Sequence, residues 1–146
     1  MKYIFLADRF YSDYAHCDEL VKKSDRPFIQ VYLCVCGIDF AIPLRSNISH
    51  NYAFWTDEAN RCGLDFTKAV VIEDSCYIDT SRKPYIRPIE HKALVGKANE
   101  IIAGMLEYIN AYIDAKEKPN NHAKQRLVKF SALQYFEKHL PRVPQA

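Results

Sequence analysis

The stretch FIQVYLCVCGIDFAIPL, residues 28–44, decides the fold expected for this chain of 146 residues. Aromatic and β-branched side chains dominate it, and these favour β-strands. The segment Gly37-Ile38-Asp39 has the composition of a turn, and a turn between two such runs is typical of a β-hairpin. We therefore predict an antiparallel pair of strands over Phe28–Cys36 and Phe40–Leu44.

Toward the N-terminus, residues 3–7 are apolar and short, as in a single strand. Over Asp8–Lys23 the apolar residues recur at spacings of three and four, which predicts an amphipathic helix. Pro27 disfavours helix in the residue before it, so Ser24–Pro27 is expected to be a loop. A strand and a helix thus precede the hairpin.

Toward the C-terminus, Cys62–Asp65 is expected to be a break, followed by short strands over Ala69–Glu73 and Ser75–Ile78. An apolar stripe then predicts one helix from Glu90 to Ile113.

A second amphipathic helix is predicted over His122–His139. The element order is therefore β-α-β-β-loop-β-β-α-α. It indicates an α+β fold, with a mainly antiparallel β-sheet core, flanking helices and long helices in the C-terminal half.

The composition fits one compact domain over residues 1–146. The chain is 49% hydrophobic and 26% charged and has only four glycines, which excludes intrinsic disorder over most of its length. Its formal net charge of +2 is too small for a protein that coats nucleic acid. A local cluster of cations can still bind phosphate, because the field in a cleft depends on arrangement.

The cysteines indicate a reducing compartment, because their number is odd and no signal-peptide pattern precedes them. They are Cys17, Cys34, Cys36, Cys62 and Cys76. Cys34 and Cys36 lack the second close pair that a zinc site needs, so we expect both to pack in the core. We expect a cytoplasmic protein with no membrane-spanning segment.

The polar loop Arg45–Tyr52 follows directly on the second hairpin strand, where scaffolds often present catalytic groups. It carries a cation, two hydroxyls, two amides and an imidazole: Arg45, Ser46, Ser49, Asn47, Asn51 and His50. Such loops also occur as turns whose side chains are satisfied locally.

Cleavage of RNA without a metal needs a base for the 2′-hydroxyl, donors for the charge on the phosphorane and an acid for the leaving 5′-oxygen. Arg45 suits the role of donor. Ser46 can donate to a phosphate oxygen or orient the nucleophile, and His50 suits the acid or base.

Two other groups of residues can contact RNA. Arg26 is expected beside Arg45 across the hairpin, where two guanidinium groups form a bidentate phosphate site; pairing with Asp25 or full solvation is the alternative. The basic segment 82–88 has cations interleaved with an aromatic, and it is either an RNA-binding strip or a solvated connector anchored by its tyrosine. Its candidate residues are Arg82, Lys83, Tyr85 and Arg87. Asn47 and Asn51 of the polar loop are further RNA-binding candidates, and Tyr52 is a candidate for stacking on a base.

Several kinds of site are not indicated by the sequence. His91, His122 and His139 lack the spacing of metal ligands, and no glycine-rich phosphate loop, GxSxG or HExxH motif occurs. Pairs of acidic residues suited to two-metal catalysis are not apparent either. We therefore expect neither a metal nor a cofactor.

A series of short blocks carries a resemblance to a known family. The blocks are Phe10…Tyr14…Leu20, Arg26-Pro27-Phe28-Ile29, Ile42-Pro43-Leu44-Arg45-Ser46, His50-Asn51, residues 62–72 and Lys83-Pro84-Tyr85-Ile86-Arg87. In this order the chain resembles the ToxN/AbiQ family of type III toxin–antitoxin endoribonucleases. The combination Pro-Leu-Arg-Ser with a following His-Asn is most similar to the CptN and TenpN branches.

The resemblance implies a metal-independent endoribonuclease with an antiparallel core flanked by helices. It implies neutralisation by a small repeat-derived RNA pseudoknot, assembly into a closed protein–RNA complex, and a role in phage defence by abortive infection or in plasmid maintenance. Cellular or phage RNA would be the substrate.

Position by position, the resemblance assigns catalytic roles to Arg26 and Ser46, and Arg45 stands where the founding branch has Thr. That branch has a Lys where this chain has Ile48, so His50 becomes the candidate for the missing acid–base group. The alternative is a catalytically silent RNA-binding module that uses the same basic groove.

Overall fold

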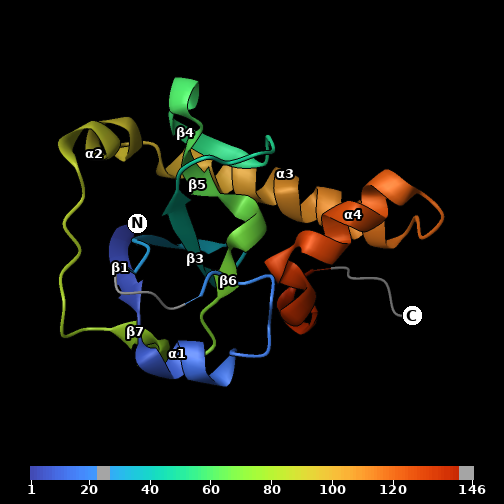
Figure 1. The fold of residues 1–146 in the computed structure, drawn as a ribbon, viewed down its shortest axis with the longest axis horizontal. Helices are drawn as coiled ribbons and strands as arrows, with labels where there is room; N and C mark the ends of the chain where they lie inside the picture. Colours follow the sequence, from blue (N-terminus) through green and yellow to red (C-terminus); the bar gives the residue numbers. More distant parts are fainter. Residues whose placement is uncertain (23–26, 142–146) are drawn as a thin grey trace.

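The structure is a computed structural model, and it describes residues 1–22 and 27–141. Within those residues, seven strands form one antiparallel sheet in the order β4-β5-β3-β2-β1-β7, with β6 pairing with β3 (Figure 1). The strands are β1 (Lys2–Leu6), β2 (Gln30–Val35), β3 (Ile38–Arg45), β4 (Ala53–Asp57), β5 (Cys62–Asp65), β6 (Val70–Val71) and β7 (Ile78–Asp79).

The long helices lie in the C-terminal half, as the sequence predicts. The helices are α1 (Asp8–Asp13), α2 (Pro88–Leu94), α3 (Ala98–Lys116) and α4 (His122–Phe130). The longest, α3, packs against β2 on one side and α4 on the other (Figure 1). This arrangement confirms the predicted α+β fold. None of the described helices is long and apolar enough to cross a membrane.

The predicted hairpin is confirmed as β2–β3, with a tighter turn than expected. Cys36 and Gly37 form the turn with φ of 52° and 75°, the left-handed geometry that matches the twist of two-residue hairpins. The strand β3 therefore begins at Ile38. In this register Val31 lies opposite Ile42, and both are fully buried.

The predicted burial of Cys34 and Cys36 is wrong, because both side chains are exposed. Cys34 lies between the buried residues Leu33 and Val35, and successive side chains of a strand point to opposite faces. Cys36 lies in the turn, beyond the sheet pairing. Among the cysteines, the buried one is Cys17.

The predicted break at Cys62–Asp65 is wrong as well, because these residues form β5, paired with both β3 and β4. The glycine that indicated a break instead allows a close approach of two strands. A Cβ atom at Gly63 would lie 2.2 Å from the carbonyl oxygen of Phe54 on β4. Phe54 and Trp55, the aromatic residues of β4, are half-buried.

Replacing Gly63 with alanine is expected to lower the free energy of unfolding by about 3 kcal/mol, because backbone atoms must shift to admit the methyl group. Urea unfolding checks this. Gly104→Ala is the control, since its added Cβ would meet side-chain and not backbone atoms, those of the Phe66 ring at 3.0 Å. An equal loss in the two variants would contradict the explanation.

The predicted elements before and after the hairpin are shorter than expected. The helix expected over Asp8–Lys23 ends at Asp13, and the chain continues in turns such as the one in which Cys17 N donates to Tyr14 O at 3.0 Å. The strand expected over Ser75–Ile78 is a 3-10 helix, Ser75–Tyr77, followed by β7. The strand expected over Ala69–Glu73 is reduced to β6.

Both C-terminal helices are interrupted. The one expected from Glu90 divides into α2 and α3 around Gly96, whose φ is 74°. The one expected over His122–His139 ends at Phe130, after which Ser131 caps a 3-10 helix by accepting from Leu133 N at 3.2 Å. The buried hydroxyls of Tyr108 and Ser131 share a hydrogen bond that ties this end to α3.

Candidate functional site

A buried carboxylate, Asp65, organises the polar groups at the end of β3. Its side chain is fully buried, and Oδ2 accepts from Arg45 Nη1 at 2.6 Å. Oδ1 accepts from the backbone N and the hydroxyl of Thr67, at 2.9 and 2.6 Å, and lies 3.1 Å from His50 Nε2. One carboxylate thus holds three side chains from β3, the following loop and the 3-10 helix Phe66–Lys68.

These partners keep Asp65 ionised. Burial raises the pKa of its carboxyl, but the hydrogen bonds from His50, Thr67 and Arg45 outweigh burial and lower the pKa below 3.8. A fixed negative charge in turn orients Arg45, whose side chain is about one-third exposed.

The lowered pKa gives a prediction for acid unfolding. The stability that Asp65 supplies is complete above pH 3.8, the pKa of an unperturbed aspartate, and is lost as the pH falls through the lower folded pKa. The difference in the free energy of unfolding between wild type and Asp65→Asn should therefore become smaller as the pH falls below 3.8. Urea unfolding across that range measures it, and a constant gap would contradict the assignment.

Both ring nitrogens of His50 are engaged. Nδ1 accepts the backbone N–H of Tyr52 at 3.0 Å, so it carries no proton. In the neutral ring Nε2 therefore bears the proton and donates it toward Asp65 at 3.1 Å, with the Thr67 hydroxyl 3.2 Å away. To act as acid or base, His50 must give up one of these partners.

The loop 46–52 is held by Arg61, which the sequence did not single out. Its Nε donates to Ile48 O at 2.9 Å and its Nη2 to His50 O at 2.6 Å. Nη2 also donates to the Asn51 side chain at 3.1 Å, and the guanidinium lies 4.4 Å from the centre of the Trp55 ring. Asn51, predicted to bind RNA, therefore has its side-chain oxygen committed to shaping the loop.

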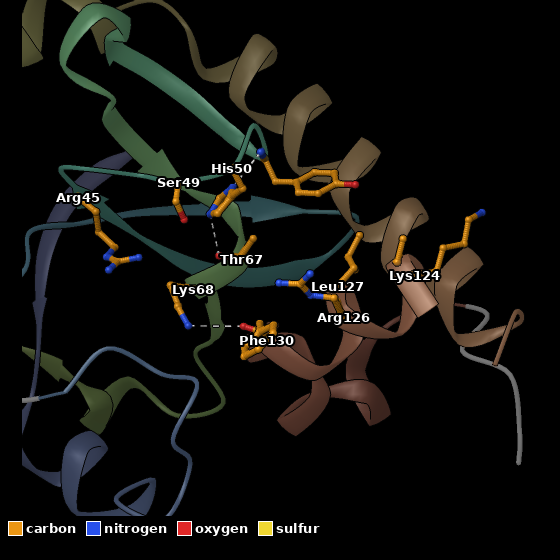
Figure 2. Close-up of a pocket in the computed structure, with 11 residues that line it drawn as sticks. Arg45, Ser49, His50, Thr67, Lys68, Lys124, Arg126, Leu127 and Phe130 are labelled. Carbon is orange, nitrogen blue, oxygen red and sulfur yellow. Dashed lines mark hydrogen bonds between the residues drawn. The ribbon is translucent and has the colours of Figure 1, made fainter. Parts of the chain in front are cut away.

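A pocket of about 640 Å³ opens between this network and α4 (Figure 2). Four cationic side chains line it, and its described lining has no acidic side chain. The lining residues are Arg45, Ser49, His50, Tyr52, Thr67, Lys68, Ala123, Lys124, Arg126, Leu127 and Phe130. We call it the cationic pocket. Such a cavity, with apolar walls and convergent donors, suits a phosphate-bearing ligand.

Lys68, at the end of the 3-10 helix Phe66–Lys68, lines the cationic pocket. Its Nζ donates to Glu19 O at 2.7 Å and lies 3.5 Å from Phe130 O, so two chain segments fix the amine (Figure 2). Burial lowers its pKa; Asp65 opposes this shift, and Arg45 adds to it. An amine with a lowered pKa exchanges a proton more readily near neutral pH.

The predicted site residues do not all meet in one place. Arg45, His50 and Tyr52 line the cationic pocket, whereas Ser46 and Arg87 line a second pocket on the other side of Arg45. Asn47 is exposed with φ of 55°. Arg26 lies outside the described residues.

The rest of the basic segment lines neither of these pockets. Arg82 donates to Asp79 at 2.9 Å and lies over the Phe5 ring, so it is held at β7. Lys83 is exposed, and Tyr85 is 78% exposed, so the alternative in which Tyr85 anchors this segment to the core is wrong. Its predicted role in RNA binding stays a prediction.

Sequence reasoning did not identify the pocket residues that come from the 3-10 helix Phe66–Lys68 and from α4. Thr67 and Lys68 stand in a block quoted only for its family resemblance, and the residues of α4 carried no motif. Asp65 followed by Thr67 is a capping pattern that identifies the 3-10 helix, but not its partners. Within the described part of the chain, no group of three or more His, Cys, Asp or Glu side chains is placed to hold a metal ion.

No protein-family model, curated protein sequence or solved structure matches this chain. The resemblance to the ToxN/AbiQ family accordingly stays a prediction from sequence motifs.

Proposed function

We propose that this chain is a cytoplasmic endoribonuclease toxin of a type III toxin–antitoxin system. It cleaves cellular or phage RNA without a metal, by attack of the 2′-hydroxyl, and leaves a 2′,3′-cyclic phosphate. A small repeat-derived RNA pseudoknot inhibits it in a closed protein–RNA hetero-oligomer. The observation that carries the proposal is the convergence of Arg45, Lys68 and Arg126, with hydroxyls and an imidazole, in one pocket.

The chemistry follows from the positions of these groups. Arg45 is oriented by Asp65 through Nη1, and its other N–H groups, which bond to no other residue among 1–22 and 27–141, stabilise the charge that develops on the phosphorane. Lys68, whose pKa burial lowers, donates a proton to the leaving 5′-oxygen. Arg126 contributes positive charge on the α4 side, whereas the amine of Lys124 is paired with Asp114.

The remaining roles are assigned to other side chains that line the cationic pocket. Tyr52 is 40% exposed at the pocket and stacks on a base. His50 serves as the general base when substrate displaces one of its two partners. His50→Ala tests this role, since wild-type cleavage by the variant would rule it out.

A direct test incubates the purified protein with a set of defined RNAs in EDTA. The expected result is cleavage with 2′,3′-cyclic phosphate ends, which disappears in an Arg45→Gln variant that still folds. Cleavage only with added metal, or none on any RNA, would overturn the proposal. Two observations test the proposed inhibition by an antitoxin RNA. They are RNA that co-purifies with the chain and tandem repeats in the DNA upstream of its gene.

One observation favours the second candidate, an RNA-binding module without catalysis. Both nitrogens of His50 are occupied, so in this conformation no imidazole lone pair faces the pocket. Under this candidate the protein binds RNA through the same cations and cuts none. Binding measured alongside the cleavage test separates the two.

A further inference from the structure

A second pocket, about 260 Å³ in volume, adjoins the cationic pocket at Arg45, which lines both. Its lining comes from the segment before β2, the end of β3, the start of β5 and the N-terminal end of α2. The residues are Pro27, Phe28, Ile29, Leu44, Arg45, Ser46, Cys62, Arg87 and Glu90. The volume is below the roughly 300–1,000 Å³ of sites for drug-sized ligands, which suits one nucleobase.

The second pocket has an apolar lining and a polar lining, which match the flat faces and the edge of a nucleobase. Pro27, Phe28 and Ile29 are half-buried and Leu44 is buried, so they offer an apolar surface to the flat faces of a ring. Ser46, Arg87 and Glu90 supply polar groups for its edge. Within residues 1–22 and 27–141, the Ser46 hydroxyl makes no recorded hydrogen bond, so it is available to a ligand.

The pair Arg87–Glu90 determines which nucleobase edge the second pocket recognises. Arg87 Nε donates to Glu90 Oε1 at 2.6 Å, which fixes the guanidinium beside the carboxylate. The pair therefore offers donors next to two acceptor oxygens. Guanine is the base whose Watson–Crick edge has the complementary order, one acceptor followed by two donors, and a bidentate carboxylate accepts both.

We propose that this second pocket is a guanine-binding subsite for a nucleotide adjoining the scissile phosphate. The inference rests on the proposed function, because Arg45 must hold an RNA phosphate between the two pockets. Glu90 accepts from the N1 and N2 groups of guanine, Arg87 donates to O6, and the apolar lining contacts the ring.

The test uses a random-sequence RNA library cleaved by the intact protein, followed by sequencing of the product ends. Wild type should show at least tenfold enrichment of guanosine at one position beside the cut, as a bidentate contact predicts, and Glu90→Gln should lose it. Glu107→Gln, an exposed carboxylate on α3, is the matched control and should keep the enrichment. No guanosine preference in wild type, or an unchanged one in Glu90→Gln, would overturn the subsite.

Inosine provides a second measurement, because it lacks the 2-amino group of guanosine. Replacing the preferred guanosine by inosine should slow cleavage by wild type and leave Glu90→Gln unaffected. Unfolding of Glu90→Gln by urea should match wild type, which separates lost recognition from lost folding. Equal slowing of the two proteins by inosine would contradict the role of Glu90.

If the wild type cuts no RNA, the proposed function fails, and the library is used for binding selection instead. Guanosine enrichment among bound RNAs that Glu90→Gln abolishes would support the subsite on a non-catalytic module. Absence of bound RNA would overturn both proposals.

Discussion

Replacing Asp65 with asparagine is expected to lower the free energy of unfolding by about 3 kcal/mol, the low end for breaking a buried ion pair. The amide retains an acceptor for the Thr67 backbone but loses the charge that holds Arg45 at 2.6 Å and His50 at 3.1 Å. Arg45 is about one-third exposed, so water partly compensates it, which keeps the loss at that low end. Urea unfolding at neutral pH measures the change.

Asp57→Asn is the matched control for this result. Asp57 also caps a 3-10 helix, accepting from Asn60 N at 3.4 Å, but it is half-buried. The Asp57→Asn substitution should lower the free energy of unfolding by about 1 kcal/mol or less, as for an ordinary cap. If the two variants lost equal stability, Asp65 would be a cap alone and not the residue that organises the site.

Replacing Lys68 with methionine is expected to reduce RNA cleavage by about 10²–10⁴-fold, the effect of removing a general acid. Methionine keeps much of the length of the side chain and removes the amine. The loss should appear in the rate of a single turnover at saturating protein, because Arg45 and Arg126 still bind the backbone. Quenched-flow or gel kinetics with excess protein measure it.

Folding must be checked in the same variant, since Lys68 also donates to the backbone oxygen of Glu19. Lys68→Arg keeps a cation in the pocket but not an amine of lowered pKa. It should restore binding more than the cleavage rate. Lys97→Gln, at the N-cap of α3 and in the lining of neither pocket, should cleave as wild type does. A single-turnover rate in Lys68→Met within a few-fold of wild type would remove Lys68 from the chemistry.

The fold was predictable where its determinants are local. The hairpin follows from two apolar runs around Gly37, and the long C-terminal helix from its apolar stripe. The errors came where tertiary contacts override local signals. Gly63 has the local character of a breaker, yet the approach of Phe54 makes glycine the residue that β5 requires.

The candidate site was predictable in part. Arg45 and His50, singled out from the polar loop as catalytic candidates, both line the cationic pocket, and their catalytic role stays a prediction. Ser46 and Arg87 were grouped with them, but Ser46, directly after β3, and Arg87, directly before α2, line the second pocket. Asp65 gave no signal, because an aspartate before a turn is ordinarily a solvated cap.

The sequence by itself determined the α+β class, the central hairpin and the place of the polar loop at a strand end, because alternation, turn composition and helical periodicity act over neighbouring residues. The tertiary structure alone decided which polar groups work together. Arg45 and Asp65 are 20 residues apart, and Lys68 and Phe130 are 62 apart. Strand register and the packing of α4 bring these pairs into contact, and neither is recorded in the local pattern of the chain.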